Sequence, residues 1–218
     1  MRSVTDEQDL VDWTADLLRI ASTSTERSQQ TRIGPSEVGF CARKTWHRLR
    51  NDHGTNDVVH APTFFGTAIH AALEAALALD DPFGQLMREV TVERDGLLGH
   101  VDLYVPEQGL VVDWKTTTKK NRRYFPSHSQ LMQVHLYAWM LQGMGYDAQR
   151  VALVCLSRDG TERDVKAHIQ AYDGSVTAEA LEWLADVENA AEAPAPALSG
   201  VICATYCEFY GSHCSGKQ

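Results

Sequence analysis

Two spacings of apolar positions recur along the chain, and each predicts one kind of element. Residues 99–115 consist of two apolar, β-branched runs joined by Pro-Glu-Gln-Gly at 106–109. Such runs around a four-residue turn are typical of a β-hairpin. Short apolar runs predict further strands at 87–95, at 151–157 and, on an edge of the sheet, near 163–169.

Apolar positions three or four residues apart predict the helices. We expect helices at 6–20, from 34 through 46, from 63 through 74, at 127–142 and at 175–190. The stretch from 21 to 33 is polar and is expected to be a linker. Strands and helices together predict an α/β fold: a mixed central sheet with the strands of 87–115 at its centre and helices on both sides.

The register of the hairpin brings two acidic residues together. If residues 106–109 form the turn, Val105 faces Leu110, and Asp102 falls opposite Asp113, with Cβ atoms about 5 Å apart. Like charges in such positions destabilise a sheet unless a cation lies between them, and carboxylates suit magnesium or manganese. Lys115 follows Asp113 by two residues and therefore points to the same face.

Two interpretations of this hairpin are open. A metal-held phosphate beside a lysine is an arrangement that cleaves phosphodiester bonds, because the metal polarises the phosphoryl group and generates hydroxide. The alternative is a surface hairpin with scattered charge, which the short pattern Asp113-Trp114-Lys115 would favour if it stood alone.

Composition limits the class of protein. The chain has 218 residues, of which 44% are hydrophobic and 22% charged, as in ordinary globular proteins. The net charge of −9 argues against a general nucleic-acid coat. We find no apolar run of membrane-spanning length and no signal-peptide pattern, so we expect a cytoplasmic protein without membrane contact.

The basic residues are concentrated locally on this acidic chain. No acidic residue lies between Asp113 and Asp147. A cluster at the start of that stretch and a second run near residue 43 are compatible with gripping one strand of nucleic acid, with ordinary solvated surface as the alternative. The candidate DNA-binding residues are Arg43, Lys119, Lys120, Arg122 and Arg123.

Three motifs in order resemble those of the RecB-like branch of the PD-(D/E)XK nuclease superfamily. They are Gly66-x-x-x-His70-x-x-x-Glu74, Asp102 followed by Asp113-Trp114-Lys115, and Gln133-x-x-x-Tyr137. The resemblance implies a restriction-endonuclease-like fold and a metal-dependent deoxyribonuclease. Its Mn²⁺ or Mg²⁺ would be held by His70, Asp102, Asp113 and the Trp114 carbonyl.

The same resemblance implies roles for the remaining motif residues. Lys115 and Gln133 would position the attacking water, and Tyr137 would lie near the substrate backbone. An imidazole beside two carboxylates favours manganese somewhat over magnesium. Basic residues such as Arg43, Arg122 and Arg123 would hold flanking phosphates.

Three cysteines crowd the C-terminal tail, as Cys203-x₃-Cys207-x₆-Cys214. A cytoplasmic enzyme should not keep structural disulfides, so a dense run suggests a metal. A closed site needs a fourth ligand, for which Cys41 is the best candidate. Cys155 lies in a predicted buried strand and is expected to be a core thiol.

One early and three late cysteines around such a core resemble the iron–sulfur RecB-like exonucleases, which include CRISPR-associated and phage relatives. The resemblance implies a [4Fe–4S] cluster that closes a helical cap. The alternative is zinc on the three tail cysteines with Cys41 or His213, although paired C-x₂-C knuckles are absent. The resemblance covers residues 34–214, expected as the nuclease domain, and leaves 1–33 as an N-terminal helix and linker.

Three functions are consistent with these motifs. The first is an exonuclease on single-stranded DNA or DNA ends, in recombination, repair or phage DNA processing. The second is a CRISPR-adaptation nuclease that trims DNA before integration. The third is a non-catalytic DNA-binding scaffold, which the intact set His70, Asp102, Asp113 and Lys115 argues against. DNA is the expected partner, and protein partners are not predicted.

Overall fold

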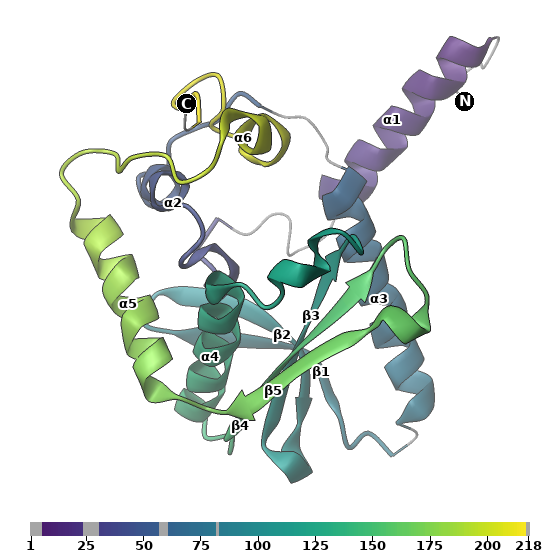
Figure 1. Cartoon of the computed structure of the whole chain (residues 1–218), viewed down its shortest axis with the longest axis vertical. Coiled ribbons are helices and arrows are strands. Elements are labelled where there is room, and N and C mark those ends of the chain that lie inside the picture. The colour runs from purple at the N-terminus through teal and green to yellow at the C-terminus, as the bar shows by residue number, and fades with distance from the viewer. Residues whose placement is uncertain (1–5, 24–30, 57–60, 82, 217–218) are drawn as a thin grey trace.

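Five strands form one mixed sheet with helices on both faces (Figure 1), as the sequence predicts. The structure, a computed structural model, describes residues 6–23, 31–56, 61–81 and 83–216; most of the predicted linker lies outside these ranges. The strands are β1 (Met87–Arg94), β2 (Leu97–Val105), β3 (Leu110–Thr117), β4 (Arg150–Ser157) and β5 (Lys166–Ala171). They are ordered in the sheet as they are along the chain.

The middle of the sheet is β3, which pairs with β2 antiparallel and with β4 parallel. The expectation that all strands of 87–115 lie at the centre is therefore wrong for β1, which is an edge strand because it continues a simple hairpin outward. Parallel strands need a crossover, here made by α4 (His128–Gly143). Ser127 caps α4: its hydroxyl accepts from the Gln130 N–H, and its own N–H donates to the Gln130 side chain.

One helix covers one face of the sheet, and two helices cover the other. On the first face, α3 (Ala61–Asp80) packs Leu73 and Leu77 against apolar residues of β2, β3 and β4. On the second, α4 and α5 (Gly174–Asn189) build the larger core, which includes Val101, Leu136 and Ala180. Apolar burial on both faces stabilises the sheet at about 25 cal/mol per Å².

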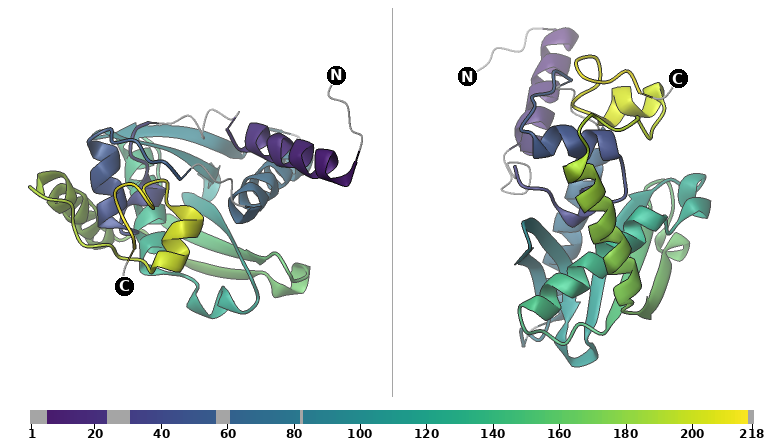
Figure 2. Two further views of the ribbon diagram at one scale, coloured as in Figure 1. Left: turned by 90° about the horizontal axis from the view of Figure 1, so that it is seen from above. Right: turned by 90° about the vertical axis from the view of Figure 1, so that its left-hand side faces the viewer.

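Helix α1 (Glu7–Thr23) contacts α3 and extends beyond the body of the molecule (Figures 1 and 2). By length and apolar composition alone α3 could cross a membrane, whereas no such segment is expected from the sequence. A single helix of this kind is weak evidence, because core helices of soluble proteins pass the same test. Here Leu73 and Leu77 of α3 already pack on the sheet.

The predicted helix from residue 34 through 46 is interrupted. It consists of a short 3₁₀ turn, η2 (Pro35–Glu37), and a separate helix, α2 (Ala42–Leu49). Gly39 separates them with a φ of +73°, a conformation that favours glycine, and a Cβ there would lie 2.5 Å from the sulfur of Met132. The break places Cys41 at the N-cap of α2, where the chain is still extended.

The C-terminal segment, with α6 (Gly200–Tyr206), lies over α2 at one end of the molecule (Figures 1 and 2). We call residues 34–56 together with 190–214 the cap. Among the described residues, four side chains of its first part donate to backbone carbonyls of its second part, one of them Arg50 to Ala190 (2.9 Å). Bonds also run from Arg43 to Pro194 (3.1 Å) and His213 (3.2 Å), from Trp46 to Ala190 (2.9 Å), and from Asn56 to Cys207 (2.8 Å).

Candidate active site

Two fully buried carboxylates lie on neighbouring strands, Asp102 on β2 and Asp113 on β3. The hairpin has the predicted register, because Val105 pairs with Leu110 and Leu103 pairs with Val112. The recorded pairing ends there, one residue before Asp102 and Asp113. The two acids therefore occupy the point where the ladder between the strands stops.

The contacts of Asp102 hold it in one orientation. Its Oδ2 accepts a hydrogen bond from the backbone N–H of Trp114 at 2.7 Å. Its Oδ1 lies 3.1 Å from Nδ1 of His70, which α3 brings down onto the sheet. Helix α3 and strands β2 and β3 thus converge on one carboxylate.

Asp113 belongs to a chain of polar contacts that leads into α4. The Lys115 ammonium lies 2.6 Å from Asp113 Oδ2 and donates to Gln133 Oε1 at 2.7 Å. The Gln133 amide nitrogen in turn donates to Asp113 Oδ1 at 3.1 Å and to the Tyr137 hydroxyl at 3.3 Å. The spacing of four residues places Gln133 and Tyr137 on one face of α4. Four predicted site residues are therefore brought together.

The charge balance of this centre fits a divalent cation. Burial raises the pKa of the Asp113 carboxyl, the nearby Lys115 ammonium lowers it, and the Asp102 carboxylate raises it further. Among the described residues, Asp113 Oδ2 has the Lys115 ion pair but no well-directed hydrogen bond. Two ionised carboxylates and one lysine leave a net negative charge in the buried site, which a divalent cation would balance. Carboxylate oxygens are also the ligands that Mg²⁺ and Mn²⁺ prefer.

Glu89 of β1 is a further acidic residue at this site and is not among the residues predicted from the sequence. One ligand atom each from His70, Glu89 and Asp102 lie within 4.8 Å of one another, as in a group that could hold a metal ion. The β1–β2 ladder skips Glu89, whose φ is +44°, and resumes at Val90. Glu89 is thus a second carboxylate beside His70, next to Asp102, while Asp113 does not belong to this group.

The signal for Glu89 is present in the sequence. Asp95-Gly96, with φ values of +47° and +83°, forms the turn between β1 and β2, and Asp-Gly is a strong hairpin signal. Counting back from the pair Arg94–Leu97 puts position 89 opposite Asp102.

We expect Glu89→Gln to weaken manganese binding by about 10- to 100-fold, the usual effect of removing a group that supports a metal site. The amide keeps the size of the side chain and removes its charge. Calorimetric titration of the purified protein with MnCl₂ measures the effect. Glu107→Gln, in the turn between β2 and β3, is the matched control. Equal affinities in all three proteins would show that Glu89 does not serve the metal.

The candidate DNA-binding residues lie in different surroundings. Lys119 and Arg122 are both paired with Asp164, at 2.9 and 3.5 Å, and Arg43 is engaged with the C-terminal segment. Lys120 is exposed. The Arg123 guanidinium lies over the ring of Tyr124, 4.8 Å from its centre.

Four of the five cysteines come together in the cap. Burial, followed by the charges of Cys207, Cys214 and Cys41, raises the pKa of the Cys203 thiol. Cys155 is buried in β4 and does not act on Cys203. Four converging thiols fit a thiolate-bound metal group, because a bound cation would stabilise the thiolates that crowding otherwise disfavours.

The geometry of the four thiols bears on the zinc alternative. Within the described ranges, no three of their sulfur atoms lie within 4.8 Å of one another, as the ligands of one ion would. His213 lies instead in a group with His47 and Asp52, its ring centre 4.9 Å from that of His47.

Comparison with solved structures gives similarities that cover 67% of this chain or more. SSO0001 has a TM-score of 0.64 at 16% identity, covering 96% of this chain and 98% of that one. A phage-related exonuclease from Haemophilus somnus 129PT gives 0.46 at 12% identity, covering 67% and 77%. The exonuclease LHK-Exo in complex with dAMP, an alkaline exonuclease from Laribacter hongkongensis, gives 0.48 at 14%, covering 78% and 83%. No curated protein matches the sequence.

The family comparison covers the sheet and most of the site. The model of the PD-(D/E)XK nuclease superfamily matches residues 77–214, which is more than half of the chain. The match contains Glu89, Asp102, Asp113, Lys115 and Gln133, and it begins after His70. The chain belongs to the PD-(D/E)XK nuclease superfamily.

Proposed function

We propose that this nuclease is a metal-dependent exonuclease that hydrolyses DNA at single strands or at duplex ends. The observation that carries the proposal is the contact chain of Asp113, Lys115 and Gln133, which holds an ammonium group at a buried carboxylate. The exonuclease mode is supported by the resemblance of its motifs and of its cysteine spacing to the RecB-like exonucleases.

In this proposal His70, Asp102, Asp113 and the Trp114 carbonyl, with Glu89, hold the divalent metal. When bound, it supplies a Lewis acid for the phosphoryl group and lowers the pKa of water. Lys115 stabilises negative charge as it develops on the phosphoryl oxygens. Gln133 keeps the Lys115 ammonium in place.

Purified protein with end-labelled single- and double-stranded DNA and MnCl₂ or MgCl₂ tests the proposal. We expect a ladder that shortens progressively from one end and needs added metal. Absence of cleavage with either metal would refute the nuclease activity. Fragments that start at internal positions, with both ends intact, would refute the exonuclease mode.

We expect Lys115→Met to lower kcat by about 100- to 1,000-fold, as the loss of one positioned charge stabiliser does in other enzymes. DNA affinity should fall by less than about tenfold, because Lys115 is one phosphate contact among several. Single-turnover rates and fluorescence anisotropy separate the two effects. Lys166→Met, on the exposed edge strand β5, is the control. A collapse of affinity with a normal rate at saturation would make Lys115 a phosphate clamp only.

We also propose that Cys41, Cys203, Cys207 and Cys214 hold a [4Fe–4S] cluster. Support comes from the convergence of the four thiols, of which three act on Cys203, and from the resemblance to iron–sulfur exonucleases. The cluster would join α2 to the C-terminal segment covalently, in addition to the hydrogen bonds from Arg43 and Asn56. A role in trimming DNA before CRISPR integration involves the same site, and identification of bound partner proteins separates it from repair.

A further inference from the structure

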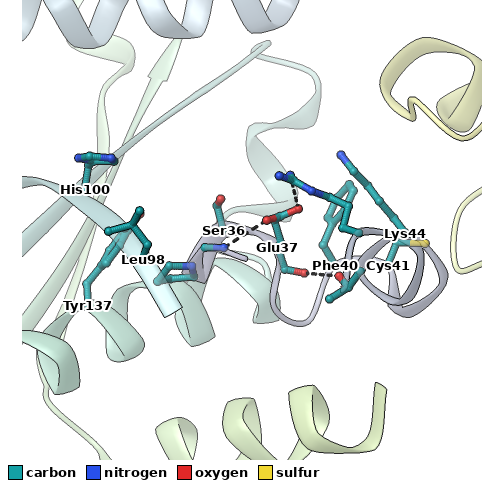
Figure 3. A pocket seen from close by; sticks show the side chains of 13 residues that line it. Ser36, Glu37, Phe40, Cys41, Lys44, Leu98, His100 and Tyr137 are labelled. Carbon is teal, nitrogen blue, oxygen red and sulfur yellow. Dashed lines mark hydrogen bonds and ion pairs between the residues drawn. The ribbon is translucent and has the colours of Figure 1, made fainter. Parts of the chain in front are cut away.

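A pocket of about 330 Å³ lies between the cap and β2, next to the active site. Figure 3 shows His100 and Tyr137 at one end and Phe40 and Lys44 at the other. We call it the Tyr137 pocket. Its volume is at the lower end of the range for small-molecule sites, about 300–1,000 Å³, which suits one nucleotide and not a base pair.

The Tyr137 pocket is connected to the catalytic carboxylates by two routes. The Tyr137 hydroxyl is bonded to Gln133, which contacts both Asp113 and Lys115. On β2, His100 precedes Asp102 by two residues, about 7 Å along the strand, and alternation points it to the same side. A strand of DNA whose phosphate lies at the carboxylates therefore places a neighbouring nucleotide at this pocket.

The chemistry of the walls suits a nucleotide. Phe40 lines the pocket and is 45% exposed, so an aromatic ring is available there to a ligand. The pocket contains two cations, of which Arg48 is paired with Glu37 at 2.6 Å. Lys44, in the part of the chain that the structure describes, has no hydrogen-bond or ion-pair partner. An exposed ring beside an unpaired ammonium group can stack a base and bind its phosphate.

Gly99 of β2 lines the pocket at a place where there is no room for a side chain. A Cβ there would lie 2.7 Å from Cε1 of Tyr137 and 3.0 Å from Cδ of Pro35. Tyr137 and η2 can therefore approach the strand closely, and together they form the floor of the pocket.

We propose that the Tyr137 pocket binds one unpaired nucleotide of a DNA strand beside the scissile phosphate, with its base stacked on Phe40 and its phosphate bound by Lys44. This inference rests on the proposed function and adds the substrate class: the strand must be single at this position. Duplex DNA reaches the site after at least one nucleotide has separated from its partner.

The test measures binding without cleavage, in the Asp113→Asn background and in metal-free buffer. The probe is a single-stranded oligodeoxynucleotide containing 2-aminopurine, followed by anisotropy and by the fluorescence of the base. Phe40→Leu keeps the apolar bulk and removes the aromatic face. We expect it to weaken binding by about 5- to 100-fold, the range for loss of one base–aromatic stack, and to remove the stacking signal. Phe65→Leu, an equally exposed phenylalanine on α3, is the control.

Lys44→Gln gives a second, independent measurement. We expect the slope of log affinity against log salt to become shallower by about 0.7, the value for one phosphate contact to a single strand. A merely structural role for Lys44 would leave that slope unchanged. Lys166→Gln, on the edge strand β5, is the matched control.

The possible failures are distinguishable. If wild-type protein cleaves DNA while Phe40→Leu and Lys44→Gln bind the oligonucleotide as their controls do, the pocket inference is wrong and the nuclease stands. If cleavage is absent but both variants weaken binding, the pocket stands and the nuclease proposal fails. Equal weakening by Phe65→Leu and Phe40→Leu would also overturn the inference.

Discussion

The variant Asp113→Asn will cleave DNA more than about a hundredfold more slowly than the wild type in the presence of metal. A hundredfold is about the upper end of the effect expected for a residue that only supports a metal ligand, and Asp113 is expected to bind the metal itself. Asparagine has nearly the same shape and can still accept the hydrogen bond from Gln133. It lacks the negative charge that a divalent metal needs and that Lys115 is paired with at 2.6 Å. A discontinuous assay with end-labelled single-stranded DNA and saturating MnCl₂ measures the loss.

A thermal melt separates this loss from misfolding. The carboxylate of Asp113 is fully buried, and burial raises its pKa, so the neutral amide should not lower the melting temperature in metal-free buffer. MnCl₂ at a hundred times its Kd should stabilise the wild type by about 2.7 kcal/mol and the variant by much less. Asp186→Asn, on the exposed side of α5, controls for net charge. Cleavage at the wild-type rate by Asp113→Asn would remove this carboxylate from the site.

The variant Cys203→Ser will lose most of the iron and most of the brown colour of anaerobically purified protein. Cys203 is 2% exposed, and three other cysteines act on its thiol. An alkoxide is a poor substitute for a soft thiolate on iron. We expect about four iron atoms per wild-type chain if the cluster is of the cubane type. Visible absorbance and iron analysis measure both quantities.

Stability should fall with the iron, because binding free energy at such a site contributes directly to folding. We expect the cap of Cys203→Ser to become sensitive to limited proteolysis, and fragments ending near residue 190 would locate the opening. Cys155→Ser, equally buried but in β4, should keep the colour and serves as the matched control. A colourless wild type with one zinc per chain would decide for zinc. Colour that survives Cys41→Ser would place the fourth ligand elsewhere.

The hairpin at the centre of the site could be predicted because its determinants are local. Turn residues at 106–109 fix the pairing of Val105 with Leu110, and strand alternation then fixes the positions of Asp113 and Lys115. Helix α4 could be predicted for the same reason, since Gln133 and Tyr137 are one helical turn apart in the sequence. The relative positions of site residues on two neighbouring strands, or on one face of a helix, can therefore be predicted from the periodicity of the sequence.

The errors arise where one segment contacts another that is distant in the sequence. Gly39 interrupts the predicted helix because Met132 of α4 occupies the space that a side chain would need. Arg43, a predicted phosphate ligand, is engaged instead by carbonyls more than 150 residues away. The Asp95-Gly96 turn sets the β1–β2 register and so places Glu89 opposite Asp102. The ladder skips Glu89, whose φ is +44°, and no local pattern predicts that interruption. Such contacts leave no periodic signal.

Much of the attachment of the C-terminal segment uses the main chain of that segment, although the His213 ring also lies 3.1 Å from the carbonyl oxygen of His53. Trp46 and Arg50 both donate to the carbonyl of Ala190 at 2.9 Å, and Asn56 donates to the carbonyls of Ala204 and Cys207. A carbonyl oxygen is present whatever the residue, so the identity of the amino acid at 190, 194 or 204 contributes nothing to these bonds. The stretch between α5 and α6, which is part of the cap, is therefore a suitable place for a fluorescent label, because a label on a side chain there leaves the carbonyl hydrogen bonds in place.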